Sequence, residues 1–178
     1  MIMDTNQIRE ILKSDKLTKS SFLGVYARDM LPKTSSPRYP FCCVANTEPS
    51  ESPGEHWVAM YFDAEGRGEF FCSYGSTPRQ GEFDRFLRRN SSNWIYNDSC
   101  LQSTDSLVCG HYCIFYLHYK CLGYSMFSIV QMFSNNRRGN DHIVSKFVKE
   151  RYSRNFSFQR LTAGIGQCCV CKRICNDD

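Results

Sequence analysis

The stretch 109–122 constrains this chain most, because only His111, His118 and Lys120 interrupt its apolar residues. Gly123 follows at once and is expected to end the segment. A helix that is apolar nearly all round belongs in the interior of a domain. We therefore expect a buried central helix that begins at a cysteine, with the rest of the chain packed around it.

Cys109 opens this helix and is a candidate nucleophile. A thiol in a first helical turn feels the positive end of the helix dipole, which lowers its pKa below about 8.5 and favours the reactive thiolate. First-turn N–H groups can hold an oxyanion, and Gln102, seven residues earlier, can add a side-chain N–H. The alternative is an inert core cysteine, and the chain has 11 cysteines. A base elsewhere must decide between the two.

Length and composition indicate an intracellular globular protein. The 178 residues are 42% hydrophobic, and no run approaches the ~20 apolar residues of a membrane span. The start of the sequence lacks the apolar core of a signal peptide. We expect the cysteines to stay reduced, and their odd number argues against a complete disulfide framework. The net charge of +4 permits an acidic partner such as nucleic acid without requiring one.

The remaining pattern predicts strands in the middle of the chain and helices at both ends. Strands are expected over 41–45, 56–62, 68–74 and 93–97, and 22–26 is a short apolar segment. Helices are expected over 5–14, with Thr5 as the cap, and over 79–89, 125–133 and 141–152, with 137–139 in a loop. The fold class is therefore α+β, with a central sheet flanked by helices. We expect one domain over 1–153 and a cysteine-rich tail over 154–178.

The tail ends in Cys168, Cys169, Cys171 and Cys175. Four thiolates can bind zinc, but the usual sites use two separated C-x₂₋₄-C pairs. A flexible tail with reducible thiols is the favoured interpretation, and a zinc site is the alternative.

His56 is the candidate base for Cys109. It begins a strand directly after a loop, where a side chain can point into a cleft, although most strand-end histidines have no such role. If the hairpin closes around Gly66, Cys72 lies beside His56 at the same end of the sheet. Since a third group often orients the imidazole of a Cys–His pair, Cys72 occupies the position of that group. Asp63 is expected at the far end of the strands.

These residues resemble the adenovirus-type cysteine proteases (adenain), within the wider group of ubiquitin-like-protein proteases. The resemblance runs from about residue 6 to 152. Its motifs are FLGVY at 22–26, NT at 46–47 leading to GEHW at 54–57, EFFCSYG at 69–75, Gln102 seven residues before Cys109-Gly110, then Cys113 and Leu117-His118. Similar sequences occur in large self-synthesising DNA transposons of animals, which makes such an origin a hypothesis for this chain.

The resemblance implies a papain-like or adenain-like fold with a mixed sheet, and a cysteine endopeptidase that cleaves protein precursors or ubiquitin-like tails. It implies His56 as general base and acid, Cys109 as nucleophile and Gln102 as oxyanion donor, with small residues such as glycine near the cut. The chain departs from the family at Cys72, where the family has Glu or Asp. A neutral thiol orients an imidazole weakly. We expect a dyad-like, slow protease, and the alternative is an inactive relative that keeps a protein-binding or DNA-associated role.

The resemblance also bears on partners and location. It implies no required cofactor, with DNA or an activating peptide as possible activators, a monomer, no membrane, and the nucleus or a virion-like particle as compatible locations. DNA contact is allowed by Arg79, Arg85, Arg88, Arg89, Arg137, Arg138, Lys146 and Lys149. The family's disulfide to its activating peptide is in doubt, because residues 89–92 contain no cysteine.

A papain-like chain order, with the base after the nucleophile, is the alternative geometry. His142 would then be the base, but it follows Cys109 by only 33 residues, against about 130–150 in papain relatives. His111 lies on the wrong side of the helix turn to serve as the base of Cys109. We expect His118 to be a satisfied core or edge histidine.

Overall fold

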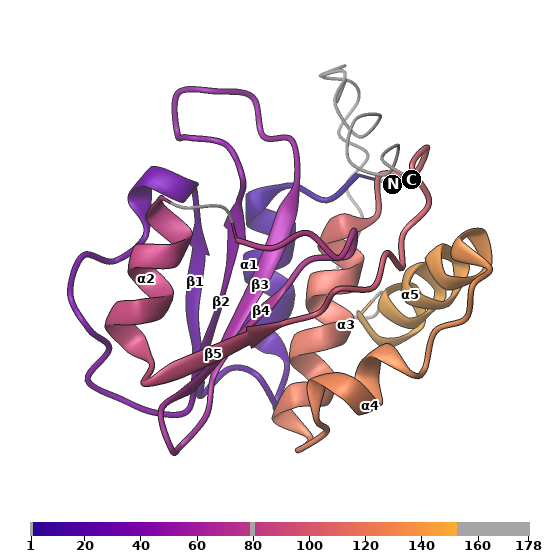
Figure 1. Cartoon of the computed structure of the whole chain (residues 1–178). Helices are drawn as coiled ribbons and strands as arrows, with labels where there is room; N and C mark the ends of the chain where they lie inside the picture. Colours follow the sequence, from indigo (N-terminus) through magenta and orange to yellow (C-terminus); the bar gives the residue numbers. More distant parts are fainter. Residues whose placement is uncertain (1, 79–80, 153–178) are drawn as a thin grey trace.

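A mixed sheet forms the centre of the computed structural model, which describes residues 2–78 and 81–152. In that part of the chain five strands pair in the order β1-β2-β3-β4-β5 (Figure 1). The outer pairs β1–β2 and β4–β5 are parallel, and the two inner pairs are antiparallel. The strands are β1 (Phe22–Tyr26), β2 (Phe41–Asn46), β3 (Trp57–Phe62), β4 (Arg67–Phe71) and β5 (Asn93–Tyr96). The predicted α+β class and the β3–β4 hairpin are confirmed.

Helices cover both faces of this sheet. In Figure 1, α2 lies on one side of the strands, and α1, α3, α4 and α5 lie on the other. The helices are α1 (Thr5–Ser14), α2 (Glu82–Asn90), α3 (Cys109–Cys121), α4 (Met126–Val130) and α5 (Arg137–Tyr152), and a 3-10 turn spans Arg28–Met30. No helix in the described ranges is long and apolar enough to cross a membrane.

Three helix ends differ from the sequence-based expectation. The cap of α1 is Asp4 and not Thr5, because Asp4 and Gln7 form a reciprocal capping box. The helix α5 begins at Arg137, within the expected loop, because the side chain of Asn136 accepts from the N–H of Gly139 at 3.0 Å. The helix α4 ends at Val130, since the next bonds are tight i→i+3 turns.

Successive side chains along a strand point to opposite faces of the sheet, so the sheet divides the core into two clusters. In β2, Cys42 and Val44 face α1 and α3, while Phe41, Cys43 and Ala45 face the opposite cluster, which contains residues of α2. A strand buried on both faces reads as an unbroken apolar run, which is how 41–45 appears in the sequence.

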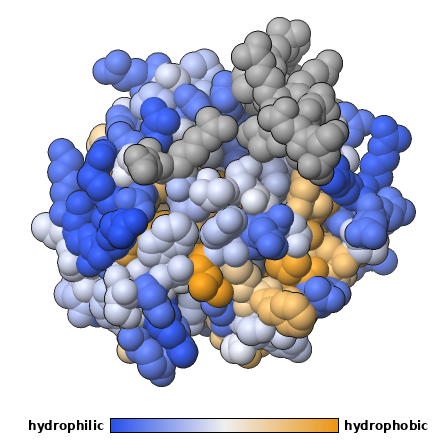
Figure 2. All heavy atoms as spheres, in the orientation of Figure 1, coloured by the Kyte–Doolittle hydropathy of each residue, from blue (hydrophilic) through white to orange (hydrophobic). Residues whose placement is uncertain are grey.

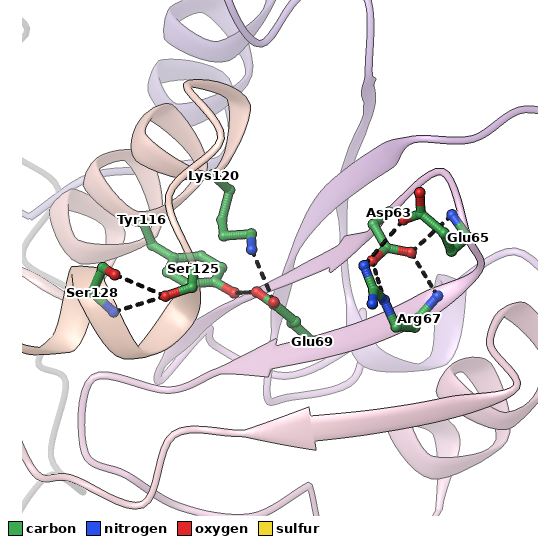
Figure 3. A network of polar contacts seen from close by, with 8 residues as sticks. All are labelled: Asp63, Glu65, Arg67, Glu69, Tyr116, Lys120, Ser125 and Ser128. Carbon is green, nitrogen blue, oxygen red and sulfur yellow. Dashed lines mark hydrogen bonds and ion pairs between the residues drawn. The ribbon is translucent and has the colours of Figure 1, made fainter.

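The predicted central helix is confirmed as α3. Its residues Tyr112, Ile114 and Tyr116 are fully buried, and Gly123 ends it with a φ of +93°. On β4, Glu69 accepts from Lys120 Nζ at 2.9 Å and from the Tyr116 hydroxyl, so two residues of α3 are held to the sheet (Figure 3). The same figure shows Asp63 paired with Arg67 at the β3–β4 turn.

The far end of α3 and the helix α4 carry exposed apolar side chains. Phe127 is 73% exposed and Leu122 is 47% exposed. Figure 2 shows apolar residues gathered at the lower right, where Figure 1 places these elements, on a face that is otherwise largely hydrophilic. The residues of the predicted tail lie outside the described part of the chain.

Candidate active site

The β3–β4 hairpin brings His56 and Cys72 together. Ala59 pairs with Phe71 in the antiparallel register, so the residue before β3 and the residue after β4 lie at the same end of the sheet. His56 Nε2 is 3.3 Å from Cys72 Sγ. The predicted proximity of these two side chains is therefore confirmed, and Asp63 lies at the opposite end, at the turn.

A tight network fixes Cys72. The side chain of Asn97 accepts from the N–H of Cys72 at 2.9 Å and donates to its carbonyl at 2.8 Å. A turn then closes with a 2.8 Å bond from the N–H of Gly75 to the same carbonyl. The N–H groups of residues 74–76 and the Ser76 hydroxyl donate toward Cys72 Sγ, yet burial has the larger effect and raises the pKa of this thiol. Cys72 is therefore a neutral thiol.

His56 is buried and uncharged near neutral pH. It is 8% exposed, its ring lies 4.9 Å from that of Tyr74, and burial lowers its pKa to about 4. Its backbone carbonyl accepts from the N–H of Thr47 at 2.9 Å, which ties the preceding loop to the site. Within the described ranges, His56 Nδ1 has no hydrogen-bond partner. Nδ1 is thus the nitrogen available for proton transfer, while Nε2 faces Cys72.

Cys109 begins α3 at the edge of a groove of about 380 Å³. Trp57, the neighbour of His56, and Cys109 both line this groove. The packing is close: Trp57 Cδ1 lies 3.4 Å from the point where a Cβ on Gly110 would stand. A glycine after the cysteine therefore lets the start of α3 approach the start of β3.

Cys113 lies one turn further along α3 and links the two sides of the site. It is buried, and its pKa is raised by burial and, to a lesser extent, by the neighbouring thiols Cys109 and Cys72. Of these two thiols, Cys109 belongs to the start of α3 and Cys72 follows the end of β4. Cys109 is partly exposed and Cys113 is fully buried, so the two thiols differ in their access to solvent.

Gln102 is fully buried beside this groove. Its Oε1 accepts from Ser73 Oγ at 2.7 Å, and its Nε2 donates to the carbonyl and to the hydroxyl of Ser106, both at 3.0 Å. The segment that carries Gln102 is anchored to α5, because Asp141 accepts from Ser103 and Asn140 donates to the carbonyl of Leu101.

Sequence reasoning did not find the residues that hold Gln102. Ser106 and Asp141 belong to no recognised motif, and Ser73 lies in the EFFCSYG motif, which does not by itself indicate a contact with Gln102. Asp141 lies 38 positions beyond Ser103, which it contacts. Only the packing of α5 against the start of α3 could reveal this pairing.

The other histidines take different places. His118 Nδ1 contacts Asp15 at 3.1 Å in the core, so the expectation of a satisfied core histidine is confirmed. His111 is buried, and burial lowers its pKa to about 4. His142 is exposed on α5 and is not among the residues that line the groove. The structure therefore gives no support to a papain-like chain order.

No group of three His, Cys, Asp or Glu side chains in the described ranges could hold a metal ion. The four cysteines proposed as an alternative zinc site, Cys168, Cys169, Cys171 and Cys175, lie outside those ranges, so that alternative stays a prediction.

Comparison with known proteins finds a relative by sequence. No protein-family model matches the chain. A protease of Bovine adenovirus C serotype 10 is 28% identical over an alignment of 91 residues, and the match covers 43% of this chain and 46% of the relative. The chain thus covers less than half of that relative's own length. The resemblance to adenovirus-type proteases that the motifs predicted is confirmed by this match.

Among solved structures, the crystal structure of a selenomethionine-labelled ASFV protease is similar. It matches with a TM-score of 0.48 and 24% identity, covering 61% of this chain and 44% of that one.

Proposed function

We propose that the chain is a cysteine endopeptidase in which Cys109 is the nucleophile and His56 is the general base and acid. The observation that carries the proposal is the orientation of His56. Its Nε2 faces Cys72, and its buried Nδ1 has no hydrogen-bond partner in the described ranges. An imidazole with one nitrogen held and the other available is the arrangement that nucleophilic catalysis requires. The adenovirus relative, which is named a protease, supports the same function.

The reaction would proceed in two stages. His56 Nδ1 takes the thiol proton, and the thiolate of Cys109 attacks the carbonyl carbon of the scissile bond. The carbonyl oxygen becomes an oxyanion near the first N–H groups of α3 and the side chain of Gln102. His56 then returns its proton to the leaving amine. A water, deprotonated by His56, hydrolyses the thioester and releases Cys109.

Cys72 limits how well His56 can act. A carboxylate only accepts hydrogen bonds, so it would hold the proton on Nε2 and leave Nδ1 basic. A thiol can also donate, and an S–H bond to Nε2 would place the imidazole proton on Nδ1, where it blocks the reaction. A neutral thiol also stabilises the imidazolium less than a carboxylate does. We therefore propose a slow dyad protease.

The proposed substrate is an extended protein segment. The groove beside Cys109 is bordered by the loop 46–55 and by residues 2–5, so a strand of protein could lie along it. Glycine near the cut is proposed by analogy with the adenovirus-type enzymes, as are protein precursors or ubiquitin-like tails as substrates.

An electrophilic peptide probe tests the activity. A peptide ending in two glycines and a vinyl methyl ester should label the wild-type chain at Cys109, and mass spectrometry of the digested protein locates the adduct. The control variant is Cys109→Ala. Under the same conditions, none of its remaining cysteines should be labelled. Equal labelling of both proteins, or labelling that does not need the peptide portion, would refute the proposal.

A protein-binding module without catalysis is the second candidate, because Cys72 replaces the expected acid and is 3.3 Å from the candidate base. Such a module would bind a peptide in the groove while Cys109 reacts no faster than a free thiol.

Activation by DNA stays a separate proposal. Of the basic residues proposed to contact DNA, those within the described ranges that pair with surface carboxylates are Arg85, Arg88, Arg138 and Lys146. Salt-dependent binding of a DNA duplex would test it.

A further inference from the structure

A row of side chains crosses three strands on the face of the sheet that α3 covers. Cys42 of β2 lies directly opposite Tyr61 of β3, and Tyr61 lies opposite Glu69 of β4. Directly opposite residues of paired strands point to the same face. Lys120, the penultimate residue of α3, contacts two members of this row. Its Nζ lies 2.9 Å from Glu69 Oε1 and 4.9 Å from the centre of the Tyr61 ring, and Figure 3 shows the pair with Glu69. The end of α3 therefore packs on this row.

Cys121, the last residue of α3, contacts the remaining member of the row. Its side chain is hydrogen-bonded to that of Cys42. Both thiols are free, and they differ in exposure: Cys42 is fully buried, whereas Cys121 is partly exposed. Leu122, which follows Cys121, is 47% exposed. A small reagent can therefore reach one thiol of the pair from solvent, while the other thiol is enclosed in the core.

The hydrogen bond gives the two thiols different chemistry. Cys42 donates its S–H to the sulfur of Cys121, which lowers the pKa of Cys121. The same bond, together with burial, raises the pKa of Cys42 well above its usual value. Lys120 lowers the pKa of Cys121 further, while burial, Asp15 and the carbonyl end of α3 oppose the shift. Because the thiolate is the reactive form, Cys121 is the nucleophile of the pair.

We propose that Cys42 and Cys121 form an oxidation site, in which hydrogen peroxide oxidises Cys121 and Cys42 then closes a reversible disulfide. The Cys121 thiolate attacks one peroxide oxygen, the O–O bond breaks, and hydroxide leaves, so that Cys121 becomes a sulfenic acid. The sulfur of Cys42 then attacks the sulfenic sulfur. The S–O bond breaks, and its hydroxide leaves as water with the proton of Cys42.

Two electrons pass from the two thiols to the peroxide in these steps. A dithiol such as reduced dithiothreitol restores both thiols by thiol–disulfide exchange. The disulfide ties β2 to the end of α3, which lies at the other end of that helix from Cys109. The inference does not depend on the proposed protease function.

Mass spectrometry of the full chain after treatment with hydrogen peroxide tests the site. The remaining thiols are alkylated in urea, and the protein is digested with trypsin. The fragments that contain Cys42 and Cys121 should be joined with the loss of two hydrogens, and dithiothreitol should release them. Cys121→Ser, which changes a partly exposed residue at a helix end, should abolish the joined fragment.

The matched control is Cys43→Ala. Cys43 neighbours Cys42 in the chain and is equally buried, but it faces the cluster on the opposite side of the sheet. The joined fragment should persist in this variant and disappear in Cys42→Ala. A joined fragment that survives Cys42→Ala would overturn the assignment. Conversion of Cys121 in the folded wild-type chain to a sulfinic acid, with no joined fragment, would also overturn it.

Two further measurements test the hydrogen bond and the link between the elements. The rate of alkylation of Cys121 by iodoacetamide at pH 7 should fall about 2- to 10-fold in Cys42→Ala, because one hydrogen bond to the thiolate is lost. An unchanged rate would contradict the role of Cys42 as donor. The disulfide closes a long loop of the unfolded chain, so the oxidised wild-type protein should unfold at a higher urea concentration than the reduced one. Cys121→Ser should show no such difference, and a lower midpoint after oxidation would refute a bond that fits the folded chain.

Discussion

Position 72 holds a thiol in surroundings that suit an anion. The N–H groups of residues 74–76 and the Ser76 hydroxyl all donate toward Cys72 Sγ. Convergent donors of this kind stabilise a negative charge, yet burial raises the pKa of the thiol and keeps it neutral. The hydrogen-bond donors that would stabilise a carboxylate at position 72 are therefore present, although the residue there is a thiol.

Cys72→Asp should convert the slow dyad into a faster triad. The carboxylate would accept from the turn N–H groups and from His56 Nε2–H, which leaves Nδ1 basic. We expect kcat/KM for the two-glycine peptide to rise at least about tenfold. A negative charge beside His56 also favours the imidazolium, so the pKa of His56 should rise from about 4 and the acid limb of the pH profile should move to higher pH.

The matched variant is Cys72→Ser. A hydroxyl is neutral and can donate to Nε2 as the thiol does. In this variant kcat/KM should not rise, and the acid limb of the pH profile should not move to higher pH. If Cys72→Asp leaves kcat/KM and its pH profile where they were while the protein stays folded, the weak-orienter argument is wrong.

The turn after β4 decides where Cys72 lies. Gly75 has a φ of +70°, and a Cβ there would stand 2.8 Å from the backbone of Asp98 and Ser99. The close approach of these two segments lets Asn97 reach both backbone groups of Cys72. The parallel pairing of β4 with β5 thus extends beyond the strands into the site.

Gly75→Ala should therefore cost both stability and activity. The left-handed φ costs a residue with a Cβ about 1 kcal/mol, and the contact with Asp98 adds to this because backbone cannot move aside. Gly66 offers a matched control, since its φ is +73° and nothing lies within 4 Å of its Cβ position. Urea unfolding and peptide hydrolysis should show Gly66→Ala losing stability alone. Equal loss of activity in both variants would contradict the role of this turn.

Three helices meet at one buried carboxylate. Asp15, at the end of α1, accepts from the Tyr152 hydroxyl of α5 and contacts His118 Nδ1 of α3. These partners hold the pKa of Asp15 below its usual range although burial opposes them.

Tyr152→Phe removes one partner of a buried acceptor and should lower the free energy of unfolding by about 1–3 kcal/mol, as urea titration would measure. Peptide hydrolysis should show an unchanged kcat. An unchanged urea midpoint would show that this hydroxyl does not hold α5 in place.

The whole molecule should lose stability between pH 6.5 and pH 4. Burial lowers the pKa of His56 and of His111 from 6.5 to about 4. In this window the unfolded chain binds protons that the folded chain does not, so the free energy of unfolding falls as pH falls. Each histidine contributes a slope of up to about 1.4 kcal/mol per pH unit.

Urea midpoints at pH 7, 6 and 5 would measure this loss. Replacement of His111 by Leu removes one titrating group, and the slope should fall by about half. The same midpoint at pH 7 and pH 5 would show that the two histidines become protonated without unfolding, and that burial does not set their pKa values.

Most elements were predictable because their signals are local. The apolar run of α3, its end at Gly123 and the hairpin around Gly66 each depend on neighbouring residues, and all three are confirmed. The start of α5 was mispredicted because 137–139 was assigned to a loop, whereas the side chain of Asn136 accepts from the N–H of Gly139 and the helix begins there. The site roles of His56, Cys109 and Gln102 were inferred from motifs and remain proposals.

The sequence by itself determined the strands, the buried helix and the proximity of His56 to Cys72, because strand period and hairpin register follow from residues close along the chain. Tertiary structure alone decided the rest. The contacts of Ser106 with Gln102, of Asn97 with Cys72 and of Asp141 with Ser103 are made by polar residues with no pattern of their own. Packing brings these segments together, and a buried polar atom then takes whichever partner lies within hydrogen-bond reach.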